Sequence, residues 1–240
     1  PDSGRPLAEL EVSPSPGVPL DVDADQAAGA TLPTTTPAQR RPVAAALRSL
    51  RAAVEIVCGV PADGARAERI DPAALEAVCA LDDAPTLFES VLSAPPDDAM
   101  TQALLAWILG RPALRDIALV QWGSDAAGGH RALEAQRRWE SGEPYPLDVG
   151  KVMWGDGPQP DADRLRAALE LCRAVAAVAP RRDRPGALVA CAWISWALGR
   201  STHAEVYARM AHEIDRHHGL ADIVRSMVAA GHLPAWAFQR

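Results

Sequence analysis

The sequence predicts an all-α fold: a repeat-like bundle of helical hairpins, preceded by a disordered or extended N-terminal arm. The hexapeptide Ala-Trp-Ile-Leu-Gly-Arg at 106–111 returns as Ser-Trp-Ala-Leu-Gly-Arg at 195–200, and each copy follows a run rich in Ala and Leu. We expect each Trp and Leu to face the core and each Gly to end a helix, because glycine adopts a positive φ at little cost. Apolar residues elsewhere recur at helical spacing, whereas β-branched runs are scarce.

The arm is expected to comprise residues 1–38. This segment is rich in Pro, Ser, Thr, Gly and Asp and has no periodic apolar residues, so we expect it to be flexible. An N-terminal helical part follows over 39–140, with helical order beginning near Pro42.

Capping residues predict the helix boundaries of this N-terminal part. Asp71 stands before a proline, which is typical of an N-cap followed by a first-turn proline. Asp97 or Asp98 is expected to cap the helix that ends in the first hexapeptide. The pair Gly128-Gly129 is expected to separate two further helices.

Residues 141–160 are dense in Gly and Pro and are predicted to form a long loop. Tyr145, Met153 and Trp154 are embedded in this loop, and we expect them to attach it to the domain. A lid over a ligand is the alternative, because long ordered loops are often functional.

A C-terminal helical part is predicted over 161–240, and 39–240 is expected to pack as one domain. Asp161 or Asp163 starts its first helix. The run 185–198 is uncharged and apolar on all sides, which is typical of a central buried helix.

Finer expectations concern the helices on either side of the second hexapeptide. Ser195 is expected to bond to a backbone carbonyl one turn back in its helix. The next helix is predicted to begin at a capping box, because Glu205 follows Thr202 by three residues. We expect Gly219 to end that helix.

The acidic composition limits the classes of partner. The formal net charge of −7 argues against general nucleic-acid binding, which usually needs a basic face. Arg40, Arg41, Arg48 and Arg51 could still form a local basic patch, so a regulator associated with nucleic acid stays an alternative. No uncharged run reaches the ~20 residues of a membrane span, so no membrane association is expected.

Four single cysteines bear on the compartment. Cys58, Cys79, Cys172 and Cys191 each lie in an apolar helical run, and none has the CxxC spacing of a metal or redox motif. We expect buried, reduced thiols, which are typical of a reducing compartment, and therefore a cytoplasmic location.

Potential metal ligands are densest between His203 and His218. The zinc motif His-Glu-x-x-His needs imidazoles at i and i+4, but His212 is followed by Arg216 at i+4 and by His217 at i+5. Histidines five positions apart are ~140° apart on a helix, which argues against such a site. Phosphate-binding loops, dinucleotide fingerprints and nucleophile elbows are also missing from the sequence. We therefore expect no catalytic residue, no metal and no cofactor.

Tryptophan is the remaining functional signal, with seven Trp against two Tyr and two Phe. Trp107, Trp193 and Trp196 lie in apolar runs and are expected in the core. The candidate binding residues have polar or loop neighbours and could line a groove or an interface, where Trp is enriched. These candidates are Trp122, Trp139, Tyr145, Trp154 and Trp236.

Several short stretches occur in a fixed order within residues 114–238. They are Arg115–Leu119, Ala192–Trp193, Trp196–Arg200, His218–Ala221 and Gly231–Trp236, with Ala204 and Ala211 between them. In these stretches the chain resembles the C-terminal region of an actinobacterial family of unknown function, the domain of unknown function numbered four-one-nine-two. The resemblance implies a helical C-terminal half and supplies no activity. Members of that family usually begin with an α/β region containing a Leu-Leu-Gly-Phe-like stretch, which has no match here.

A looser similarity is to tetratricopeptide-like hairpins, through Leu198-Gly199 and Ala211. Helical hairpins of this kind stack into surfaces that bind proteins or peptides. We therefore expect a non-enzymatic interaction or assembly module that binds a protein partner or a second copy of itself. The alternative is an enzyme of unknown mechanism, with a site between the 203–218 helix and the 141–160 loop.

Overall fold

The structure, a computed structural model, describes residues 27–59 and 70–238, and within these ranges every regular element is a helix. In chain order, with η for a 3-10 helix, the elements are η2 (Ala28–Ala30), α1 (Pro37–Val57), α3 (Pro72–Cys79), η3 (Ala80–Asp83), α4 (Ala84–Ser93), α5 (Ala99–Leu109), α6 (Pro112–Trp122), α7 (Ala126–Glu140), α8 (Leu147–Gly150), η4 (Lys151–Trp154), α9 (Ala162–Val178), η5 (Arg181–Asp183), α10 (Pro185–Ala197), α11 (Ser201–His212), α12 (Gly219–Ala229) and η6 (Ala235–Phe238). The predicted all-α fold is confirmed.

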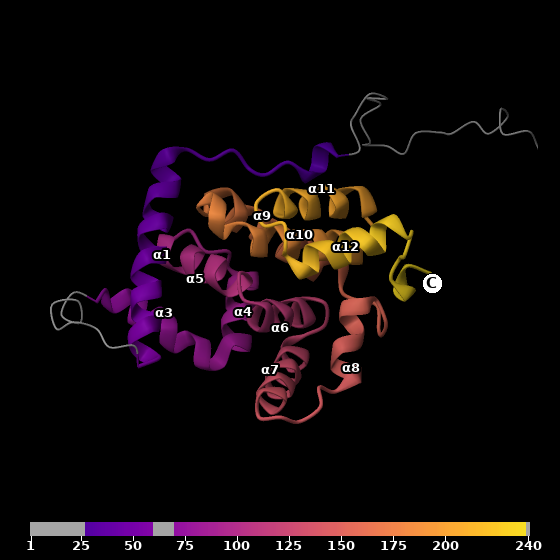
Figure 1. The fold of residues 1–240 in the computed structure, drawn as a ribbon, viewed down its shortest axis with the longest axis horizontal. Coiled ribbons are helices and arrows are strands. Elements are labelled where there is room, and N and C mark those ends of the chain that lie inside the picture. Colours follow the sequence, from indigo (N-terminus) through magenta and orange to yellow (C-terminus); the bar gives the residue numbers. More distant parts are fainter. Residues whose placement is uncertain (1–26, 60–69, 239–240) are drawn as a thin grey trace, which may run out of the picture.

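The helices form two groups around a continuous core. Helices α1 and α3–α7 lie at one end, and α9–α12 lie side by side at the other (Figure 1). Successive helices pack against each other in α6–α7, α9–α10, α10–α11 and α11–α12, which gives the hairpin arrangement. Helix α10 also contacts α5 and α6, so the core runs through both groups.

Helix α10 is the central helix of the molecule. Every residue from Pro185 to Ala197 is buried, as the uncharged run predicts. A helix that is apolar all round has no face suited to water, so it is stable only when neighbouring helices surround it.

The acidic N-caps are confirmed for three helices. The carboxylates of Asp71, Asp98 and Asp161 accept backbone N–H bonds at the starts of α3, α5 and α9. The capping box predicted at Thr202 is wrong, because the N-cap of α11 is Arg200, two residues earlier, and no side chain caps this helix. Gly219 begins α12 rather than ending α11, which stops at His212.

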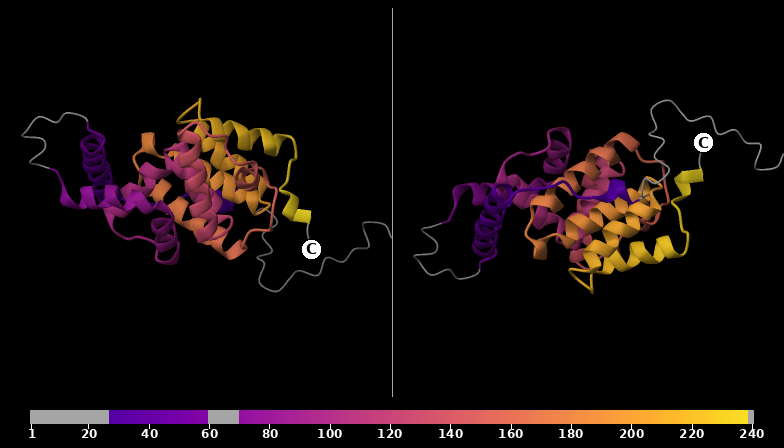
Figure 2. Two further views of the ribbon diagram at one scale, coloured as in Figure 1. Left: turned by 90° about the horizontal axis from the view of Figure 1, so that it is seen from below. Right: turned by 90° about the horizontal axis from the view of Figure 1, so that it is seen from above.

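The arm differs from the expectation over its described part. Helix α1 begins at Pro37, with a capping box between Thr36 and Gln39, rather than near Pro42. Residues 27–36, here called the strap, cross the C-terminal helices (Figure 2). The hydroxyl of Thr35 donates to the carbonyl of Ala177 at 3.0 Å, and the carbonyl of Thr31 accepts from Arg173 at 2.6 Å. The rest of the arm, residues 1–26, lies outside the described residues.

Two segments predicted to separate helices contain helical structure themselves. The predicted loop over 141–160 contains the short elements α8 and η4. Gly128 and Gly129 lie inside α7, which starts after the N-cap Asp125. A β-carbon at Gly129 would meet the Gln121 side chain at 2.1 Å, so this glycine allows α6 and α7 to pack closely instead of ending a helix.

The two hexapeptides end their helices differently. Gly199 has φ +74°, and the Arg200 N–H donates to the Ser195 carbonyl at 2.8 Å, which forms a Schellman motif. Gly110 has φ −73°, so the positive φ predicted for the first copy is wrong.

The expectation that all four thiols are buried is also wrong in part. Cys172 and Cys191 are buried, whereas Cys58 and Cys79 are exposed free thiols near the ends of α1 and α3. Burial raises the pKa of the Cys191 thiol, and the neighbouring Cys172 raises it further.

Candidate functional site

An apolar groove lies where the 141–160 segment meets α6 and α12. Its volume is about 240 Å³. We call it the Trp154 groove, and its lining residues are Asp116, Val120, Tyr145, Gly150, Met153, Trp154, Leu220 and Ile223. The lining residues come from α6, from the short helices α8 and η4 with the preceding Tyr145, and from the first turns of α12.

The backbone of the η4 wall is attached to the C-terminal helices at successive residues. The Trp193 indole N–H donates to the Met153 carbonyl at 3.0 Å. A ring nitrogen of His232 lies 3.3 Å from the Trp154 carbonyl, and the Ala235 N–H donates to the Gly155 carbonyl at 2.8 Å. These bonds fix the path of the chain through Trp154.

Gly155 allows this attachment because nothing larger fits. Its φ is +85°, in the left-handed region that favours glycine. A β-carbon there would lie 2.6 Å from the Cα of Pro234 and 2.7 Å from the Trp196 ring. The chain can therefore turn closely against the core just after Trp154.

The side chain of Trp154 is exposed although its backbone is held. The residue keeps 55% of its surface accessible, and Ile223 across the groove keeps 39%. Ordering a flexible side chain on binding costs about 0.5–1.5 kcal/mol, and this cost is lower for a rigid ring on a fixed backbone. Trp154 thus presents a large apolar surface that is already positioned for contact.

One end of the Trp154 groove is polar. The carboxylate of Asp116 pairs with Arg115 at 2.8 Å and stays 45% accessible. Loss of surrounding water raises the pKa of Asp116, although Arg115 opposes this shift. Burial and the nearby Asp116 raise the pKa of Tyr145, so its hydroxyl stays neutral. The groove therefore combines apolar walls with one carboxylate and one phenol.

The structure brings together two of the candidate binding residues, Tyr145 and Trp154. Trp139 is also 55% exposed, but it lies near the end of α7 and is not among the lining residues of the Trp154 groove. Leu220 and Ile223 also line the groove. Their helical spacing in the sequence indicates only that they lie on the apolar face of a helix, so it did not identify them as groove residues.

Trp122 and Trp236 are core residues, which corrects their assignment to a binding surface. Trp122 is fully buried, with its ring edge-on to Phe88 at 6.1 Å. Trp236 is 3% exposed, and its indole N–H donates to the Ala197 carbonyl at 3.0 Å. Neither ring is accessible to a partner.

The alternative site around 203–218 does not form as a helix face. Helix α11 ends at His212, which lies 3.3 Å from Asp222, and His217 and His218 lie in the connection to α12. Among residues 27–59 and 70–238, no group of three His, Cys, Asp or Glu side chains is placed to hold a metal ion. The hydroxyl of Ser195 is buried and has no hydrogen-bond partner in the part of the chain that the structure describes, so its predicted bond to the carbonyl one turn back is wrong.

The proposed basic patch on α1 is divided. Arg40, Arg41 and Arg48 are exposed, whereas Arg51 is partly buried and pairs with Asp183. None of the helices in the described ranges has the length and hydrophobicity needed to cross a bilayer.

Comparison with known proteins identifies no relative of this chain. No family model, curated protein or solved structure matches the chain. The resemblance of residues 114–238 to the actinobacterial family therefore stays a prediction, and the functional argument depends on the chain's own residues.

Proposed function

We propose that the protein is a non-enzymatic interaction module that binds a protein segment in the Trp154 groove. The observation that carries the proposal is the combination of a fixed backbone and an exposed ring at Trp154. Tryptophan is enriched among the residues that contribute most to protein interfaces. A ring on a fixed backbone has few torsions left to order when a partner covers it.

The chemistry of the groove indicates what the partner presents. A groove of about 240 Å³ with apolar lining such as Trp154 and Ile223 suits an apolar side chain of the partner. The accessible Asp116 carboxylate favours a Lys or Arg next to that side chain. The net charge of −7 adds a long-range attraction for a basic segment.

A phage-displayed peptide library, selected on the full-length chain and counter-selected on Trp154→Ala, tests the proposal. We expect the enriched peptides to share an apolar residue close to Lys or Arg. Trp154→Ala should weaken the binding of a selected peptide at least tenfold, because a central Trp often contributes ~2 kcal/mol or more.

Trp139→Ala is the matched control, because Trp139 and Trp154 have the same exposed fraction of 55%. It should leave the affinity within about twofold, since many interface-distant residues are energetically neutral. The proposal would be wrong if no sequence is enriched, or if selected peptides bind the parent and Trp154→Ala equally. An Asp116→Asn variant that keeps full affinity would remove the basic residue from the recognition rule.

A further inference from the structure

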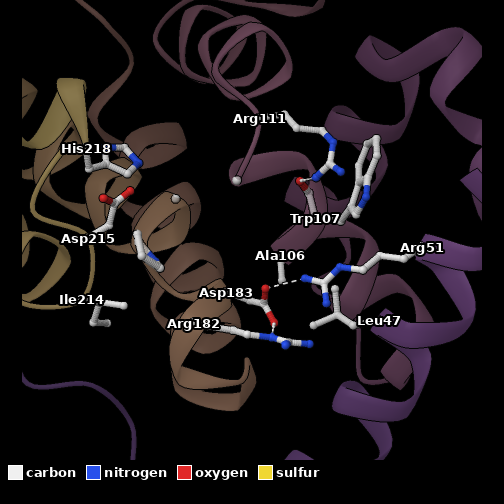
Figure 3. Close-up of a pocket in the computed structure, with 13 residues that line it drawn as sticks. Leu47, Arg51, Ala106, Trp107, Arg111, Arg182, Asp183, Ile214, Asp215 and His218 are labelled. Carbon is white, nitrogen blue, oxygen red and sulfur yellow. Dashed lines mark hydrogen bonds and ion pairs between the residues drawn. The ribbon is translucent and has the colours of Figure 1, made fainter. Parts of the chain in front are cut away.

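A second cavity lies between the two helical groups, away from the Trp154 groove. It has a volume of about 360 Å³ and is lined by the middle of α1, the end of α5, η5, the start of α10 and the connection from α11 to α12. Figure 3 shows Arg111, Trp107 and Arg51 on one wall, with His218 and Asp215 on the other. We call it the Arg111 pocket. Its size is at the lower end of the range for small-molecule sites.

Arg111 lies over the ring of Trp107, with its Cζ 3.2 Å from the ring centre. Its Nη1 donates to the Trp107 carbonyl at 2.9 Å, and it forms no ion pair with any residue in 27–59 or 70–238. A guanidinium carries five N–H donors, so this bond leaves most of them free. Burial, and then repulsion from Arg51, lower the pKa of Arg111 to about 10, so the group stays charged at neutral pH.

Positive charge exceeds negative charge on this side of the pocket. Arg51 and Arg182 both pair with Asp183, Arg182 at 3.5 Å, and Arg111 adds a third guanidinium group that has no carboxylate of its own among the described residues. The first residues of α10 also line the pocket, and no side chain caps this helix. A helix start carries a partial positive charge, which adds to the field of the arginines.

The opposite wall adds one carboxylate and no positive charge, so the pocket keeps an excess of positive charge. Asp215 accepts the N–H of His217 at 3.1 Å and is exposed. Burial, with a smaller effect of Arg115, lowers the pKa of His218, which therefore adds no positive charge at neutral pH. Its Nδ1 is buried and has no hydrogen-bond partner among the described residues.

The second hexapeptide provides an internal comparison. There the Trp196 indole N–H donates to the His232 carbonyl at 2.7 Å, and Arg200 is exposed. In the first copy the Trp107 Nε1 is buried without an acceptor in the described part of the chain. The same Trp-x-x-Gly-Arg pattern therefore has two outcomes. In the second copy the indole N–H is bonded inside the core, and in the first copy the Trp and the Arg line an open cavity.

We propose that the Arg111 pocket binds a small molecule that carries an oxyanion, either a carboxylate or a phosphate. Arg111 and Arg51 supply planar guanidinium donors, which match two oxygens of such a group. The ligand would replace water beside a half-buried cation that the protein leaves without a counter-ion. The two cavities share no lining residue, so substitutions can alter the lining of each one separately.

The indole region of a proton–nitrogen NMR spectrum tests the proposal on the full chain. Inorganic phosphate and citrate are titrated separately into ¹⁵N-labelled protein, with sodium chloride added to keep the ionic strength constant. The Trp107 signal is assigned as the one missing from Trp107→Phe. We expect this signal to move in a saturable way with at least one of the two ions, and the ion that saturates identifies the oxyanion.

Matched variants distinguish a site from a general charge effect. Arg111→Gln should weaken binding at least tenfold, whereas Arg200→Gln, the equivalent change in the second hexapeptide, should leave it unchanged. Arg182→Gln tests the pocket without altering the stack of Arg111 on Trp107, because the Arg182 side chain is 74% exposed. This variant should weaken binding several-fold. Movement that never saturates, that chloride reproduces, or that persists in Arg111→Gln and Arg182→Gln would overturn the proposal.

Discussion

Replacement of Gly155 by alanine tests whether close packing beneath the Trp154 groove stabilises the fold. Two separate costs add at this position. The first is the left-handed backbone, since φ is +85° and a β-carbon in this region costs about 1–2 kcal/mol. The second is a clash, because the new carbon would lie 2.6 Å from Pro234 and 2.7 Å from Trp196.

Insertion of a methyl group into a filled site typically costs about 1–3 kcal/mol. Gly155→Ala should therefore lower the free energy of unfolding by about 2–5 kcal/mol. For a chain of this size, 1 kcal/mol corresponds to a fall in Tm of roughly 2–4 °C, so the expected fall is about 4–20 °C.

Gly199→Ala is the matched control for the backbone cost alone. Gly199 has a similar φ of +74°, but a β-carbon there would have no neighbour within 4 Å. Its Tm should fall by only about 2–8 °C. Thermal unfolding followed by circular dichroism measures both variants. Equal falls for the two would refute the clash at Gly155, and with it the close contact between this turn and the core.

Two further predictions concern the core and its charged edge. Trp196→Ala removes a fully buried ring and should lower the free energy of unfolding by about 3–5 kcal/mol. Trp139→Ala, at a residue that is 55% exposed, should change Tm by less than about 2 °C. Similar shifts in Tm for the two variants would contradict the core position of Trp196. Bonds from Arg164 lower the pKa of Glu89 to about 2, so the stability that Glu89 adds is present above pH ~4.5 and is lost as the pH falls towards 2. The difference in Tm between the parent and Glu89→Gln should therefore shrink from pH 5 to pH 3, and a constant difference would argue against this ion pair.

Features that depend on a few neighbouring residues can be predicted from this sequence. The caps at Asp71, Asp98 and Asp161 reach only two or three residues, so the local pattern determines them. The buried helix α10 is similarly evident, because an uncharged run has no polar face to expose.

The two hexapeptides end differently although their sequences are alike, because a different residue follows each of them. Pro112 follows Arg111, and a residue before proline is restricted to extended backbone. Arg111 accordingly has φ −115° and ψ 116°, so the chain turns there and Gly110 stays helical.

Long-range packing accounts for what the sequence did not indicate. Trp122 has polar neighbours, which suggested exposure, but the Gln121 amide donates to the Pro85 carbonyl at 2.9 Å and the Ser124 hydroxyl donates to the Val120 carbonyl at 2.6 Å. Polar groups that are satisfied inside the protein do not bring their neighbours to the surface. The Trp154 groove likewise depends on long-range packing, because its lining residues come from α6, from the 141–160 segment and from α12.

The strap has a consequence for the order in which the chain can assemble during synthesis. Thr31 and Thr35 emerge from the ribosome early, but their partners Arg173 and Ala177 each lie 142 residues later. Helix α11, which η2 contacts, emerges later still. N-terminal segments generally fold first during synthesis, but this one has no surface to dock on until the C-terminal helices exist.

Ribosome-bound chains that stop before α9 should therefore carry an undocked strap, open to protease, while α1 and α5 can already pair. Closure of the strap is a late event that reports completion of the C-terminal helices. A nascent chain released too early would be marked by its exposed strap.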